Sequence, residues 1–272
     1  MLLSRIEHDG APRLKLNEGL LPEEVTLASL LALGHSELIE RLESLHKEAG
    51  EGGKLLCPAE AYHEVWACGV TYLRSRDARK LESQVADVYE RVYDADRPEI
   101  FFKALGWRSV GHGADVRIRA DSKWNVPEAE VCLVVNRHLE IVGYCAGNDM
   151  SSRDIEGENP LYLPQAKMYN GSCALGPGIK FIKSGEALEL SVTVRIERSG
   201  NEVFAEQTST ANMKRSFEDL VSYLGREMDF AEGVFLMTGT GMVPPDDFSL
   251  QAGDVVTIGV GELELVNTVA EK

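Results

Sequence analysis

Residues 127–149 read PEAEVCLVVNRHLEIVGYCAGND, two apolar runs on either side of a short polar break. Both runs are rich in β-branched residues, and the break NRH at 136–138 is typical of a turn. The stretch therefore predicts a β-hairpin with antiparallel strands. Side chains at i and i+2 of a strand share a face, so Glu128 and Glu130 should project together. Counting residues across the hairpin then places Asp149 near the end of the ladder that carries Glu128.

Further short strands surround this hairpin and predict a mainly β fold with α/β elements. Each run is rich in β-branched residues and is bounded by turn residues. One amphipathic helix interrupts them, with Ser216 and Asp219 forming a start similar to a capping box. The predicted strands after the hairpin are LELSVTVRIE (188–197), EVFAEQ (202–207), VVTIGVG (255–261) and LELVNTV (263–269).

The chain is predicted to divide into a small N-terminal α/β domain, residues 1–58, and a larger domain, residues 59–272. Two strands near residues 2–6 and 13–16 should precede a helix capped by Ser36. In the larger domain, the strand VWACGVTY at 65–72 should lead into a helix, whose predicted apolar face comprises Leu81, Val85, Val88, Tyr89 and Val92.

The charge balance excludes some classes of partner. The chain has 28 basic and 44 acidic residues, a formal net charge of −16, whereas nucleic acids and anionic membranes select a positive surface.

The five cysteines include no CxxC pair, which argues against a disulfide framework or a zinc site. The N-terminus lacks the apolar run of a signal peptide or membrane span. We therefore expect a cytoplasmic protein.

The three acidic residues of the hairpin point to a metal. Carboxylates this close repel one another unless a proton or a cation lies between them. Ligation by oxygen alone favours Mg²⁺, with Mn²⁺ or Ca²⁺ as alternatives, over zinc. Glu128, Glu130 and Asp149 are the expected ligands. The alternative is an ordinary solvated strand edge with alternating acids.

Residues 148–179, which begin at the end of the hairpin, form a polar segment punctuated by Gly and Pro. Segments of this length without regular structure are uncommon and are usually functional. The alternative is a surface loop with many ion pairs. Its potential donors and acceptors include Arg153, Asp154, Glu156, Asn159, Gln165 and Lys167.

Several strings in order resemble the fumarylacetoacetate hydrolase superfamily over residues 62–269. They are RPEIFFKA (97–104), DSKWNVPEAEV (121–131), SSRDIEGENPLYLPQAK (151–167) and SCALGP (172–177). In detail they are most similar to the branch of 2-keto-3-deoxy-D-arabinonate dehydratases. The resemblance implies a mixed β-roll fold, a homo-oligomer (a dimer or tetramer), and a metal-dependent lyase that converts a 2-keto-3-deoxy sugar acid to 2,5-dioxopentanoate.

The resemblance also implies roles for single residues. It makes Glu128, Glu130 and Asp149 the metal ligands, and it places Lys167 beside the metal and the substrate. Glu99 becomes a candidate acid or base, although it could instead simply pair with Arg97 or begin a strand. Further candidates for contact with a small 2-keto acid substrate are Arg76, Lys103, Glu156, Gln165 and Thr240.

One departure from the family bears on the reaction. Hydrolases of the superfamily carry a catalytic His three residues after a Tyr that matches Tyr72, and Ser75 occupies that position here. Without this base, an attacking water lacks its usual activation. The sequence thus favours elimination of water. The alternatives are a metal-dependent acylpyruvate or fumarylacetoacetate-type C–C hydrolase, an oxaloacetate decarboxylase, and a binding protein without catalysis.

Overall fold

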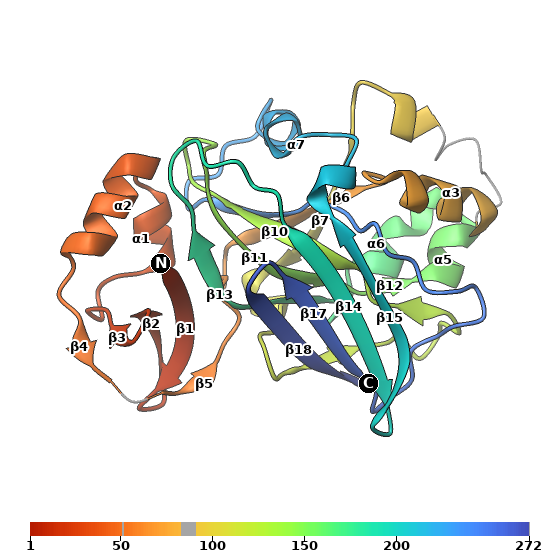
Figure 1. Ribbon diagram of the computed structural model, residues 1–272, viewed down its shortest axis with the longest axis horizontal. Coiled ribbons are helices and arrows are strands. Elements are labelled where there is room, and N and C mark those ends of the chain that lie inside the picture. Colours follow the sequence, from red (N-terminus) through yellow and green to blue (C-terminus); the bar gives the residue numbers. More distant parts are fainter. Residues whose placement is uncertain (51, 83–90, 272) are drawn as a thin grey trace.

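Two packed β-sheets make up most of the protein in a computed structural model that describes residues 1–50, 52–82 and 91–271 (Figure 1). The larger sheet has the order β4-β3-β2-β1-β13-β11-β10-β16-β6-β7, with β5 paired to β1. The smaller sheet has the order β15-β14-β17-β18-β8, and β12 pairs with β9 separately. The predicted mainly β fold is confirmed.

The strands of the larger sheet are β1 (Leu2–His8), β2 (Ala11–Leu16), β3 (Gly19–Leu20), β4 (Glu48–Ala49), β5 (Lys54–Leu55), β6 (Glu64–Gly69), β7 (Glu99–Leu105), β10 (Ala129–Val135), β11 (Ile141–Asp149), β13 (Cys173–Phe181) and β16 (Val234–Met237). The other strands are β8 (Asp115–Arg117), β9 (Asn125–Val126), β12 (Ser151–Ser152), β14 (Ser191–Arg198), β15 (Asn201–Ser209), β17 (Val255–Val260) and β18 (Leu263–Ala270).

The helices are short. They are α1 (Leu27–Leu31), α2 (His35–Ser44), α3 (Leu73–Glu82), α5 (Arg153–Glu158), α6 (Leu163–Lys167) and α7 (Phe217–Leu224), with 3₁₀ turns at Gly106–Arg108, Pro160–Tyr162 and Thr210–Asn212. Within the described residues, no helix is long and apolar enough to cross a membrane. Ser216 caps α7 by accepting a bond from the Asp219 amide, as predicted.

The predicted hairpin is confirmed, and it lies in the middle of the larger sheet. β10 and β11 pair antiparallel, with Cys132 opposite Cys145. One face of β10, which carries Val131 and Leu133, packs against the smaller sheet in a shared apolar core. Cys132 and Val134 alternate onto the opposite face and pack in a second core. Glu130 lies two residues before Cys132, so its side chain belongs to this second face.

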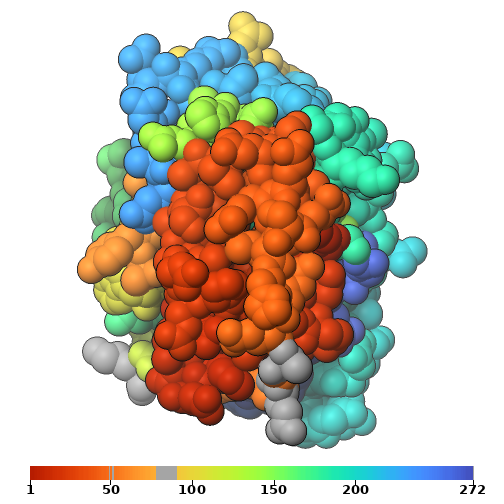
Figure 2. Space-filling view, turned by 90° about the vertical axis from the view of Figure 1, so that its left-hand side faces the viewer, coloured from red at the N-terminus to blue at the C-terminus, as the bar shows by residue number. Residues whose placement is uncertain are grey.

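The N-terminal segment extends the larger sheet and covers one side of the molecule (Figure 2). Leu3 of β1 pairs with Ile179 of β13. Leu38 and Leu42 of α2 are buried in the same core as Phe235 of β16. The domain division at residue 58 therefore stays a prediction, since the two parts share a sheet and a core.

The predicted cap of α2 at Ser36 is wrong. The helix begins at His35, and its N-cap residue, Gly34, offers no side-chain bond. The His35 amide instead donates to Glu140 Oε2 at 2.7 Å. Glu140 follows the turn of the distant hairpin, so local sequence could not reveal this capping partner.

The segment at 148–179 was expected to lack regular structure, which is also wrong. It folds into β12, α5, the 3₁₀ turn Pro160–Tyr162 and α6 before β13 begins. Asn159 caps the 3₁₀ turn by accepting a bond from the Leu161 amide at 3.0 Å. Earlier in the chain, the predicted helix after β6 begins as α3, and most of its predicted apolar face lies outside the described residues.

Candidate metal centre

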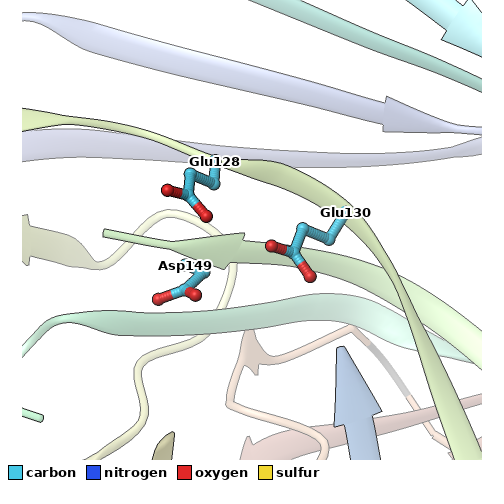
Figure 3. Close-up of side chains that lie close together, drawn as sticks. All are labelled: Glu128, Glu130 and Asp149. Atoms are coloured by element: carbon cyan, nitrogen blue, oxygen red, sulfur yellow. The ribbon is translucent and has the colours of Figure 1, made fainter. Parts of the chain in front are cut away.

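The side chains of Glu128, Glu130 and Asp149 converge at one end of the β10–β11 hairpin (Figure 3). One carboxylate oxygen from each residue lies within 4.8 Å of the others. The Asp149 amide donates to the Glu128 carbonyl at 3.0 Å, so the hairpin register itself brings these residues together. Their exposed fractions are 6%, 1% and 1%. The predicted convergence is confirmed, and a solvated strand edge is excluded.

Buried cations surround two of the carboxylates. Lys167 Nζ lies 2.9 Å from Glu128 Oε2 and 3.0 Å from Asp149 Oδ2. Arg153 Nη2 lies 2.8 Å from Glu128 Oε1, and Lys103 Nζ pairs with Asp149 Oδ1. Opposite charges at these distances offset the mutual repulsion of the carboxylates. The acidic cluster is thus held in place by side chains from β7, α5 and α6.

Glu130 has a different environment. Its Oε2 accepts a bond of 2.6 Å from the Gly239 amide. Its buried Oε1 makes no hydrogen bond to any part of the chain that the structure describes. Burial above all, and then the charges of Asp149 and Glu128, raise the pKa of Glu130 well above its ordinary value. A buried acceptor without a partner is costly, so a proton or a cation is expected there.

The donor set fits a hard divalent cation. The three candidate ligands offer only carboxylate oxygens, which suit Mg²⁺, Mn²⁺ or Ca²⁺ better than zinc. The unpartnered Glu130 Oε1 supplies an acceptor that no described group uses. The assignment of these residues as metal ligands stays a prediction, and their chemistry and placement support it.

Strand β7 turns one face toward this centre. Glu99, Phe101 and Lys103 alternate onto the same face. Lys103 reaches Asp149, and Lys167 Nζ lies 5.7 Å from the centre of the Phe101 ring. A β-bulge opposite the junction of Val65 and Trp66 leaves Lys103 as the extra residue. Bulges often re-aim a side chain next to a functional site, and here the bulge accompanies an inward-pointing lysine.

Of the other residues predicted to bind substrate, some lie next to partners of the carboxylate cluster and others do not. Thr240 is buried directly after Gly239, and Glu156 Oε2 lies 3.4 Å from Arg153 Nη1, so both lie next to partners of the cluster. Arg76 instead bonds to Asp77 and lies over Tyr93. The Gln165 side chain is exposed, whereas the carboxylates are buried. Substrate contacts by Arg76 and Gln165 are therefore the least supported predictions.

Three supporting residues received no role from the sequence. Ser151 Oγ donates to Glu128 Oε1 at 3.0 Å and accepts a bond of 2.6 Å from Lys167 Nζ. The sequence indicates Arg153 only as a potential donor in the segment after the hairpin. It indicates no role for Gly239. The signal for Ser151 was available, because it lies two residues beyond Asp149 and so shares its side of an extended chain.

Lys103 is a buried ammonium whose donors are all used within the protein. Its exposed fraction is 0%, and Nζ bonds to the carbonyls of Met150 and Lys167 as well as to Asp149. An ammonium has three N–H donors, so none is left for a substrate. Lys103 therefore fits a positioning role better than the substrate contact predicted from the sequence.

We expect Lys103→Met to lower the free energy of unfolding by about 3–5 kcal/mol, because removing one partner of a buried ion pair leaves Asp149 Oδ1 and the carbonyls of Met150 and Lys167 without their donor. Urea unfolding followed by circular dichroism would measure this loss. The matched control is Lys180→Met, which breaks the more exposed pair with Glu262 and should cost under about 1 kcal/mol. Equal stability of the two variants would contradict the assignment of Lys103 as a required counter-ion.

Comparison with known proteins agrees with this geometry. The family described as fumarylacetoacetate (FAA) hydrolase C-terminal matches residues 65–270. A probable 2-keto-3-deoxyxylonate dehydratase of Haloferax volcanii is 49% identical over 212 residues, which cover 76% of this chain and 72% of that protein. A 2-dehydro-3-deoxy-D-arabinonate dehydratase of Saccharolobus solfataricus is 42% identical over 217 residues, which cover 77% of this chain and 72% of that protein.

The whole fold also matches a solved structure. A 2-keto-3-deoxy-D-arabinonate dehydratase complexed with magnesium and 2,5-dioxopentanoate superimposes with a TM-score of 0.87 at 32% identity, covering 100% of this chain and 99% of that one. The match includes the N-terminal segment that the family description leaves out. The chain therefore belongs to the fumarylacetoacetate hydrolase family, in the branch that contains these 2-keto-3-deoxy pentonate dehydratases.

Proposed function

We propose that this protein is a Mg²⁺-dependent dehydratase that removes water from a 2-keto-3-deoxy pentonate to give 2,5-dioxopentanoate. The observation that carries the proposal is the buried cluster of Glu128, Glu130 and Asp149, with Lys167 bonded to two of its members. The names of the relatives and the ligands of the similar structure support the same activity.

The three carboxylates would hold the metal through their oxygens. Bound Mg²⁺ would supply Lewis-acid polarisation of the substrate's keto group, which makes the C3 protons more acidic. Mn²⁺ or Ca²⁺ also suits this donor set. Lys167 and Arg153 add positive charge beside Glu128 and so provide an environment for the substrate's own carboxylate.

We assign proton transfer to Lys167 and Glu99. Lys167 Nζ already lies among the candidate ligands, and Glu99 lies on the face of β7 that carries Phe101 below Lys167. One group takes a proton from C3, and the other gives a proton to the C4 hydroxyl, which leaves as water. A C3–C4 double bond forms, and tautomerisation then moves hydrogens from C5 and its hydroxyl onto C3 and C4, which leaves an aldehyde at C5.

Hydrolysis is less well supported, because its usual base is missing. Ser75 stands where hydrolases of the family carry His, and it is buried. The preceding histidine, His63, already uses both ring nitrogens, one with the Glu60 amide at 3.1 Å and one with the Glu232 carbonyl at 2.9 Å. Elimination needs no attacking water, so it agrees with the residues that are present.

The names of the two curated relatives are compatible with a single substrate. Arabinonate and xylonate differ at C2 and C3, and both centres are lost once C2 is a ketone and C3 carries no hydroxyl. For acids of the D series the remaining centre, C4, is then the same. We therefore propose the 2-keto-3-deoxy acid derived from D-pentonates as the substrate.

We also propose a cytoplasmic homo-oligomer, a dimer or tetramer. The five cysteines are all free and buried, which agrees with a reducing compartment. The oligomer rests on the resemblance to the family. Light scattering would measure the mass of the protein in solution and so test the proposed oligomer directly.

The activity can be tested by incubating the protein and Mg²⁺ with a 2-keto-3-deoxy-D-pentonate, an acylpyruvate and oxaloacetate, followed by ¹H NMR. We expect the aldehyde signal of 2,5-dioxopentanoate from the first compound alone, and loss of turnover with excess chelator. Release of pyruvate from either of the others would indicate a hydrolase or decarboxylase instead. No reaction with any of them would favour a binding protein.

A further inference from the structure

The carboxylate of Glu99 lies directly over Gly69. The two residues are cross-strand partners, Gly69 as the last residue of β6 and Glu99 as the first of β7. A Cβ atom added to Gly69 would lie 2.1 Å from Glu99 Oε2 and 2.5 Å from its Cδ. Glu99 therefore occupies the space that any larger side chain at residue 69 would need.

The strand register places Glu99 at the same end of the larger sheet as the candidate metal centre. β6 runs parallel to β16 with Ala67 beside Met237, so continuing the register brings Gly69 level with Gly239, whose amide bonds to Glu130. Burial raises the pKa of Cys68, which directly precedes Gly69, and the charges of Glu130 and then Glu99 raise it further. Both carboxylates are therefore close enough to act on the same thiol. Glu99 on β7 and Glu130 on β10 thus lie at the same end of the larger sheet, with β16 and β6 between them.

We infer that Gly69 is a positioning residue, whose missing side chain allows the Glu99 carboxylate to fold across β6 toward the reacting atoms. This inference rests on the proposed role of Glu99 in proton transfer. Its physical basis is steric, because a methyl group and a carboxylate oxygen cannot occupy the same space. A glycine in a strand weakens it, and often marks a place where another group approaches closely.

The substitution Gly69→Ala should act on the Glu99 side chain without straining the backbone. The φ angle of Gly69 does not lie in the left-handed region, so alanine fits its backbone. The three atoms closest to the added Cβ all belong to the Glu99 side chain, whose far end can rotate away. At Gly106, by contrast, the added atom would lie 1.8 Å from the Glu60 carbonyl oxygen of the backbone. Alanine at residue 69 should therefore displace Glu99 and little else.

The expected result for Gly69→Ala is a fall in kcat of about 10²–10⁴-fold, the range for loss of a general acid or base, with KM changed less than about threefold. The melting temperature and the Mg²⁺ affinity, measured by calorimetry, should match the parent protein. The matched control is Gly52→Ala, because a Cβ at that exposed glycine meets nothing within 4 Å. Loss of Mg²⁺ binding or of folded protein in Gly69→Ala would overturn the inference, since the methyl group would then disturb more than Glu99.

A double-mutant cycle with Glu99→Ala completes the test. Without the carboxylate the methyl group meets no obstacle, so Gly69→Ala should have no further effect on kcat in that background. Independent, additive losses would overturn the inference, and so would a normal kcat in Gly69→Ala when Glu99→Ala alone is impaired. Full activity of Glu99→Ala overturns both the inference and the proposed role of Glu99, so the two failures are distinguishable.

Discussion

Replacing Glu130 with Gln should weaken Mg²⁺ binding by more than about 100-fold and abolish turnover, while the fold remains intact. Loss of an outer-shell partner of a metal ligand already costs about 10–100-fold in affinity, so loss of a ligand should cost more. The amide is the same size as the carboxylate, and its oxygen can still accept the bond from Gly239. The fold should tolerate the change because burial raises the pKa of Glu130, which means that the site penalises the charged form of this side chain.

Isothermal titration calorimetry with Mg²⁺ would measure the affinity, and circular dichroism would check the fold. In the parent protein, affinity should increase with pH as the proton leaves Glu130, because proton and metal compete for one carboxylate. Glu130→Gln should lose that part of the pH dependence. The matched control is Glu202→Gln, which removes an exposed charge from β15. Normal Mg²⁺ binding by Glu130→Gln would remove this residue from the ligand set.

Lys167→Ala should lower kcat by about 10²–10⁴-fold and leave Mg²⁺ bound. The ammonium lies 2.9 Å from Glu128 and 3.0 Å from Asp149, where it can both contact a substrate held by these ligands and move a proton. Its removal takes a competing cation away from the carboxylates, so the metal should not dissociate more easily.

Steady-state kinetics together with calorimetry separates these effects. Lys183→Ala is the matched control, because Lys183 is an exposed lysine after β13 whose loss should not alter either measurement. Lys167→Arg would keep the charge but alter the reach and the acidity of the group, so we expect it to bind Mg²⁺ and remain slow. Parent kinetics in Lys167→Ala would rule out its role in proton transfer.

Features confined to one hairpin could be predicted from the sequence. The two apolar runs in 127–149, separated by a short polar turn, specified two antiparallel strands, and the period of two placed Glu128 and Glu130 on one face. The turn at NRH then fixed the register that brings Asp149 beside Glu128. These are consequences of local geometry, because the partners are linked by a short turn. The resemblance to the family added Lys167 and Glu99, which no local pattern singled out.

Only the tertiary structure showed how distant strands complete the centre. Lys103 of β7 bonds to Met150, 47 residues further along the chain, although β16 and β6 separate β7 from the hairpin in the sheet order. The overlap of Glu99 with the space beside Gly69 likewise depends on the pairing of β7 with β6. Sequence periodicity gives the face from which a side chain projects, but it does not give the segment that the side chain meets. That choice depends on how whole sheets pack, which is set by burial of the two apolar cores.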